Sequence, residues 1–146
     1  MRIELPDVNV LLALLDPMHP HHETANQWYA GTMSSGWATC PLTENGFVRV
    51  ISNASYPGVR VRPADAVALL EVAVANPVAA HHFWPDSVSL RDRILFTPAA
   101  IAGPKLITDV YLLGLCQRNG GTLVTLDTGI TPAAIVSPHP ELLRLL

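Results

Sequence analysis

Four acidic side chains stand at places where a folded chain would bury them at least in part. They are Asp7, Glu44, Asp109 and Asp127. Asp7 and Asp127 each end a short apolar run of the kind that forms a strand. Glu44 and Asp109 are each followed by apolar residues three, four and seven positions later, and on a helix these positions share the face that turns toward the core. A buried carboxylate is costly unless it is hydrogen-bonded, paired or bound to a metal.

If the four acids converge, the chemistry they support is that of a divalent cation. Close carboxylates repel one another, and this repulsion raises their pKa values. A hard cation such as Mg²⁺, which proteins hold through a few carboxylates and waters, removes the repulsion. One or two such ions can activate a water molecule and stabilise the leaving oxygen of a phosphodiester. Polar residues beside the acids are placed to orient them by hydrogen bonds: Asn9, Thr43, Thr108 and Thr125.

The elements that must position these acids alternate between strands and helices. We expect strands at 3–5, 37–40, 81–84, 122–126 and 134–136, and helices at 8–16, 19–33, 41–52, 64–75, 90–96, 105–119 and 139–146. This alternation favours a mainly parallel sheet with helices on both faces, a three-layer α/β/α arrangement. In such sheets, sites form outside the carboxyl ends of the strands. The sequence therefore predicts one α/β domain over residues 1–146.

Charge and composition narrow the class of protein. The net charge of −3 argues against binding nucleic acid by bulk electrostatics, although an acidic site can still approach phosphates through bound cations. No apolar run reaches the roughly 18 residues of a membrane span. Asp7 and Asn9 interrupt any signal-peptide-like start, so we expect a cytoplasmic protein. Cys40 and Cys116 form no C-x-x-C pair and are expected to be buried, reduced thiols.

The four acids lie in segments that resemble signature segments of the PIN-domain family. These segments are 5–14 (LPDVNVLLAL), 40–50 (CPLTENGFVRV), 107–113 (ITDVYLL) and 123–127 (LVTLD). Their order and spacing are most similar to the VapC-type toxins of bacterial toxin–antitoxin pairs. The similarity extends over nearly the whole chain.

The resemblance implies an endoribonuclease that depends on Mg²⁺ or Mn²⁺ and hydrolyses RNA phosphodiester bonds with a metal-activated water. It implies that the four acids are the catalytic and metal-holding residues, with Asn9, Thr108 and Thr125 in support. It also implies a small cognate antitoxin that occludes the site, and a homodimer.

Two other functions remain open on the sequence alone. A receiver-like phosphotransfer module also gathers aspartates around Mg²⁺, but it needs a lysine at the end of a late strand, and Lys105 precedes a helix instead. A non-catalytic protein-binding domain would account for a composition that is 49% hydrophobic, with a mean hydropathy of +0.30. Single acids have structural explanations too, because Asp7 suits a helix N-cap and Asp109 suits a helix N-terminus.

Overall fold

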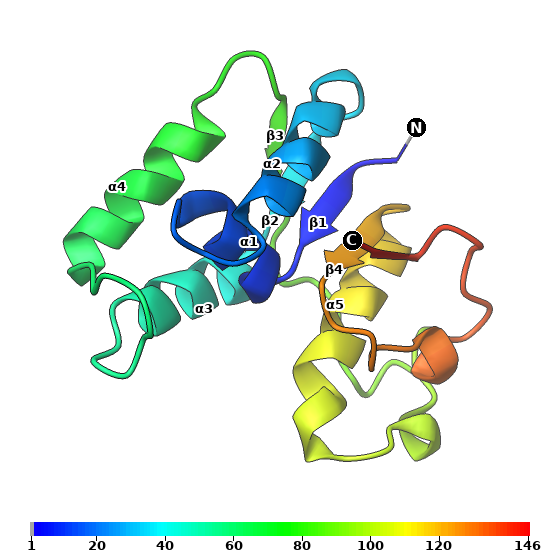
Figure 1. The fold of residues 1–146 in the computed structure, drawn as a ribbon. Helices are drawn as coiled ribbons and strands as arrows, with labels where there is room; N and C mark the ends of the chain where they lie inside the picture. The colour runs from blue at the N-terminus through cyan, green and yellow to red at the C-terminus, as the bar shows by residue number, and fades with distance from the viewer. Residues whose placement is uncertain (1) are drawn as a thin grey trace.

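A parallel sheet is the centre of the computed structural model, which describes residues 2–146 (Figure 1). Within these residues five strands form one sheet in the order β3-β2-β1-β4-β5, and each of the four strand pairs is parallel. The strands are β1 (Glu4–Pro6), β2 (Trp37–Thr39), β3 (His81–Phe83), β4 (Thr122–Thr125) and β5 (Leu143–Leu145). The prediction of a mainly parallel sheet is confirmed.

Helices cover both faces of this sheet, as predicted. They are α1 (Val8–Leu15), α2 (His22–Gly31), α3 (Pro41–Ile51), α4 (Pro63–Val74) and α5 (Ile107–Arg118). Helices α1 to α4 share one buried apolar cluster and α5 belongs to a second. Successive residues of β4 point to opposite clusters, because Leu123 joins the α5 side and Val124 joins the α1–α4 side. Figure 1 shows α5 apart from the other four helices.

Short local signals explain where several helices begin and end. Proline occupies the first position of α3 and of α4, where its missing N–H and fixed φ suit a helix start. Asp7 caps α1. Gly120, with φ +66°, follows the end of α5 in the left-handed conformation that glycine adopts most readily. These signals place α1, α3, α4 and α5 within two residues of their expected bounds.

The second helix begins later than expected. The prediction started it at His19, whereas α2 starts at His22. Side chains take up the backbone donors of the preceding turn: the Met18 N–H donates to Asp16 Oδ1, and the His21 N–H donates to His19 Nδ1. Such local bonds compete with the helical pattern.

The helix expected at 90–96 is wrong, because these residues form turns around Asp92. The Phe96 N–H donates to the Asp92 carbonyl at 2.8 Å, and the Ile94 N–H donates to Asp92 Oδ1 at 2.9 Å. Arg118 of α5 forms an ion pair with the same carboxylate. Phe96 is thereby directed into the core beside Gly114, where the ring leaves no space for a β-carbon.

The C-terminal expectations are also wrong. Residues 134–136 were expected as the last strand and 139–146 as a helix. Instead Pro132–Ala134 is a 3₁₀ turn, Ile135 makes one isolated bridge to Phe96, and the last strand is β5. Because β4 is buried along its whole length, its outer edge needs a partner, and β5 pairs with it.

Both cysteines are buried, as expected. Trp28, Trp37 and Trp84 lie in the core, and Cys40 and Cys116 are buried free thiols. No helix within residues 2–146 is both long enough and apolar enough to pass through a membrane.

Candidate active site

Asp7 is a buried carboxylate at the carboxyl end of the central strand β1. Its Oδ1 accepts a hydrogen bond from the Val10 N–H at 3.0 Å, which caps α1. Its Oδ2 accepts a hydrogen bond from the Thr125 hydroxyl at 2.6 Å. Only 6% of the residue is exposed. Both oxygens are therefore fixed in direction by the start of α1 and the end of β4.

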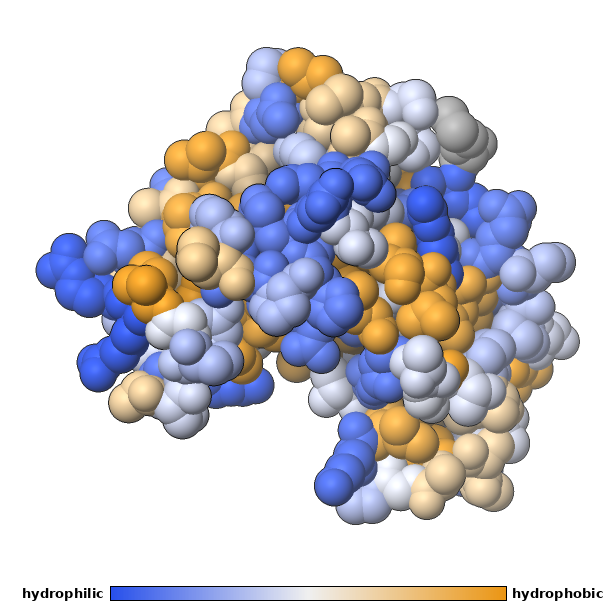
Figure 2. Space-filling model, in the orientation of Figure 1, coloured by the Kyte–Doolittle hydropathy of each residue, from blue (hydrophilic) through white to orange (hydrophobic). Residues whose placement is uncertain are grey.

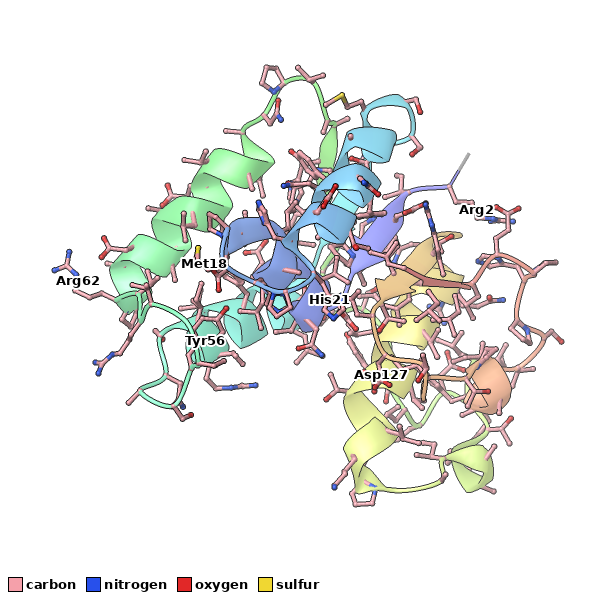
Figure 3. All side chains as sticks on the ribbon, viewed as in Figure 1. Arg2, Met18, His21, Tyr56, Arg62 and Asp127 are labelled. Atoms are coloured by element: carbon pink, nitrogen blue, oxygen red, sulfur yellow. The ribbon has the colours of Figure 1, made fainter. Side chains whose placement is uncertain are left out.

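Thr125 joins Asp7 to the loop that follows β4. The side chain is fully buried, and its oxygen accepts the Asp127 N–H at 3.0 Å while its hydroxyl donates to Asp7. The exposed carboxylate of Asp127 accepts the Gly129 N–H at 2.8 Å, which holds the loop in a turn. Figure 3 shows Asp127 in this loop, in front of α5.

The third aspartate, Asp109, lies half-buried in the first turn of α5. Burial raises its pKa, and the negative charges of Asp7 and then Asp127 raise it further. Burial likewise raises the pKa of Asp7; the hydrogen bonds from Thr125 and Val10 oppose this effect, and the charge of Asp127 adds to it. The three aspartates therefore lie close enough to feel one another's charge.

Glu44 belongs to a different hydrogen-bond network. It lies half-buried near the start of α3, and its Oε2 accepts the Thr39 hydroxyl at 2.5 Å. The same Thr39 oxygen lies 2.8 Å from His81 Nε2. Of the four acids, the structure brings the three aspartates together and holds Glu44 at the end of β2.

The expected supporting residues differ in whether their side chains contact an acid of the site. Thr125 touches Asp7 directly. The side chains of Asn9 and Thr108 are exposed, and Asn9 contributes its backbone N–H to the Asp7 carboxylate. Thr43 instead accepts the Cys40 N–H and closes the first turn of α3. The role of each in supporting the site stays a prediction.

Comparison with known proteins decides the family. A model of the PIN domain matches residues 5–135 of the chain. This chain belongs to the PIN-domain family. Its relatives include three proteins from Mycobacterium tuberculosis. Ribonuclease VapC44 is 44% identical over 131 residues, which is 90% of this chain and 90% of the relative. Ribonuclease VapC39 is 42% identical over 89% of this chain and 92% of the relative. Ribonuclease VapC38 is 41% identical over 97% and 99%.

Sequence reasoning did not assign Thr39 and His81 of this PIN domain to the site. The two residues lie in the strands expected at 37–40 and 81–84, and the pattern of acids marks neither of them. The signal that could have found them is strand register. Once β2 and β3 pair in parallel with Trp37 opposite His81, residues 39 and 81 extend from neighbouring strands on one face of the sheet.

The aspartates of this PIN domain have the chemistry of a divalent-cation site. No group of three or more His, Cys, Asp or Glu side chains within residues 2–146 is already arranged to hold a metal ion. The donors nevertheless fit one, because carboxylates whose pKa is raised by burial and by mutual repulsion gain most from a hard cation. Figure 2 shows the surface notched between the parts of the molecule formed by α3 and α5, and Figure 3 shows Asp127 on the α5 side.

Proposed function

We propose that this PIN domain is the toxin of a toxin–antitoxin pair and acts as an endoribonuclease that depends on Mg²⁺ or Mn²⁺. Its relatives named ribonuclease VapC support the proposal, because they are 41 to 44% identical over about nine tenths or more of the chain. The observation that carries the proposal is the meeting of three aspartates at the carboxyl edge of the sheet. The match also favours this function over a receiver-like phosphotransfer module.

In this proposal Asp7, Asp109 and Asp127 hold the cation, and Glu44 completes the set of acids. When bound there, a divalent cation would neutralise the carboxylates and would supply a water activated for attack on an RNA phosphodiester. The chain's own part is positioning. The Val10 N–H and the Thr125 hydroxyl direct the two oxygens of Asp7, and the Gly129 N–H directs Asp127. Carboxylates fixed before binding need no rearrangement during the reaction.

The proposal also names partners and a location. RNA is the substrate, a small cognate antitoxin blocks the site, two copies form a homodimer, and the protein works in the cytoplasm. With a net charge of −3, the chain gains little from bulk attraction to RNA. The approach of a phosphate to the aspartates therefore depends on the cation.

The central test is Asp7→Asn. Asparagine keeps the N-cap acceptor for Val10, so the fold is expected to persist. With purified protein, total cellular RNA and Mg²⁺, we expect the variant to lose cleavage by at least about a hundredfold, because it removes a cation ligand. Asp65→Asn, at an acid on the exposed face of α4, is the matched control and should cleave like wild type. Full Mg²⁺-dependent cleavage by Asp7→Asn would contradict the proposed mechanism.

Toxicity is tested separately in cells. Induced expression should arrest growth, and co-expression of a small neighbouring gene should restore it. Mapping of 5′ ends in cellular RNA after induction then identifies the cleaved RNA. Normal growth in the presence of abundant folded protein would argue against the toxin function.

A further inference from the structure

Glu44 shares its network with two residues that the proposed mechanism does not use. Thr39 ends β2 and is fully buried, and its oxygen lies 2.5 Å from Glu44 Oε2 and 2.8 Å from His81 Nε2. The contacts join strand β2, helix α3 and the edge strand β3. Because the Thr39 hydroxyl has a single hydrogen and two neighbours, only a few positions of that hydrogen and of the imidazole N–H satisfy both contacts.

The direction of each hydrogen bond follows from the donors present. An ionised carboxylate only accepts, and a hydroxyl has one hydrogen. The Thr39 hydrogen therefore points to Glu44, and the Thr39 oxygen accepts a hydrogen from His81 Nε2. The opposite imidazole tautomer would turn the Thr39 hydrogen toward His81 and remove the Thr39 bond to Glu44. The charged Glu44 thus selects the Nε2–H form of His81.

His81 is itself held in place. It pairs in register with Trp37 of β2, and its ring packs edge-on against the Trp37 ring with centroids 4.9 Å apart. Burial lowers the pKa of His81, and the neighbouring His82 lowers it further, which favours the neutral ring. A neutral imidazole has one N–H, and here it is the Nε2–H that donates to the Thr39 oxygen.

We propose that Thr39 and His81 are positioning residues for Glu44, an inference that rests on the proposed role of Glu44 in RNA cleavage. The Thr39 bond occupies Oε2 and leaves Oε1 for a ligand. Fixing a long, flexible glutamate before binding lowers the entropy cost of assembling the site. The edge strand β3 thereby acts on the site without touching substrate.

Variants of the network separate positioning from general stability. Thr39→Val keeps the shape and removes the hydroxyl, Thr39→Ser restores a hydroxyl, and His81→Phe keeps a ring against Trp37 without an N–H. His82→Phe is the matched control, because His82 is exposed on the same strand. The substrate is an oligoribonucleotide that spans a cleavage site mapped on total RNA, and thermal unfolding checks that each variant is folded.

We expect Thr39→Val and His81→Phe to lower kcat about 10- to 100-fold with KM nearly unchanged, as is typical when a partner of a ligating group is lost. Thr39→Ser should recover most of the loss, and His82→Phe should match wild type. In a Glu44→Gln background, Thr39→Val should cause no further loss, because it acts through Glu44. Equal losses in both backgrounds would show a merely structural role and overturn the inference.

A second measurement needs neither metal nor RNA. The ¹⁵N chemical shifts of the His81 ring report its tautomer, and we expect Nε2–H in wild type and loss of that preference in Thr39→Val. A wild-type Nδ1–H ring would overturn the inference. A different result would contradict the proposed function. If the Glu44→Gln variant cleaves like wild type, Glu44 has no role in cleavage. A loss in Glu44→Gln with none in Thr39→Val overturns the inference alone.

Discussion

Replacing Thr125 by valine tests how the fold maintains a buried carboxylate at the site. Valine has nearly the same shape, so the substitution removes the hydroxyl and little else. The lost bonds are the one donated to Asp7 at 2.6 Å and the one accepted from the Asp127 N–H at 3.0 Å. Within residues 2–146 Thr125 is the one side chain that donates to Asp7, and only 6% of Asp7 is exposed.

The size of the effect follows from these two bonds. A hydrogen bond to a buried charged group contributes about 1.5–3 kcal/mol. The second bond adds less, because Asp127 lies at the surface and water can replace the lost acceptor. We therefore expect Thr125→Val to lower the free energy of unfolding by about 2–3 kcal/mol at pH 7.

The same substitution should make stability more dependent on pH. The Thr125 bond lowers the pKa of Asp7, against burial, which raises it. Without the hydroxyl the folded-state pKa rises further above the unfolded value of 3.8. A raised folded-state pKa means that stability is complete below the unfolded value and is lost as pH rises through the folded one. The variant should therefore be most destabilised near pH 7, and the difference should shrink to about 1 kcal/mol toward acidic pH, as Asp7 takes up its proton.

Urea unfolding with EDTA, from pH 4 to pH 8, measures this difference. Thr43→Val is the control, because Thr43 is equally buried and bonds to Cys40 rather than to a carboxylate. Its destabilisation should not change over this range, and Thr125→Ser should restore most of the wild-type stability. A difference for Thr125→Val that is constant with pH, or smaller than about 0.5 kcal/mol, would refute the reasoning.

Cation binding, one core glycine and one tyrosine provide three further tests. Mg²⁺ at a hundred times its Kd should stabilise the protein by about 2.7 kcal/mol, seen as a rise in Tm that EDTA reverses. Gly114→Ala would place a methyl group 2.1 Å from the Phe96 ring and should cost about 1–3 kcal/mol in urea unfolding, whereas Gly31→Ala, with nothing within 4 Å, should stabilise α2 by up to about 1 kcal/mol. Burial and the bond to Asp16 raise the pKa of Tyr56 from 10 to about 12. Its stabilising effect is therefore complete below pH 10 and lost as pH rises toward 12, and Tyr56→Phe should remove that part of the alkaline fall.

Local signals were enough to locate most of the helices and strands. Pro41 opens α3 and Pro63 opens α4, and apolar runs between turn residues identify β2 and β4. These elements are encoded by residues a few positions apart, so a sequence alone contains the information. The turns at 90–96 are different, because local bonds to Asp92 replace the helical pattern that the apolar residues suggest. The ion pair of Asp92 with Arg118 joins these turns to a helix that is distant in the sequence.

The C-terminal strand could not be found from local pattern. Residues 143–145 pair with β4 through three aligned positions, and Arg144 forms an ion pair with Glu4 of β1 at 2.7 Å. Both contacts need the rest of the sheet to exist first. A leucine-rich segment next to a chain end has no intrinsic preference strong enough to show this.

The positions of residues at strand ends could be predicted from the sequence. Contacts that depend on the register between paired strands could not. The positions of Asp7 and Asp127 follow from the rule that parallel strands gather their carboxyl ends at one edge. The Thr125–Asp7 bond joins residues 118 positions apart and follows from the β1–β4 pairing. The contact of His81 with Thr39, which in turn bonds to Glu44, depends on which strand pairs with β2, and the sequence alone does not specify this.

The fold also explains why the aspartates stay together despite their repulsion. Strands β1 and β4 pair through Leu5 and Leu123, both fully buried, so Asp7 cannot move away from Asp127 without opening the core. Asp109 is likewise tied to α5, whose apolar side packs in the same core. Protonation of a carboxylate or binding of a cation then relieves the repulsion without opening the core. The raised pKa values of Asp7 and Asp109 reflect the tendency toward protonation, and the proposed function relies on cation binding.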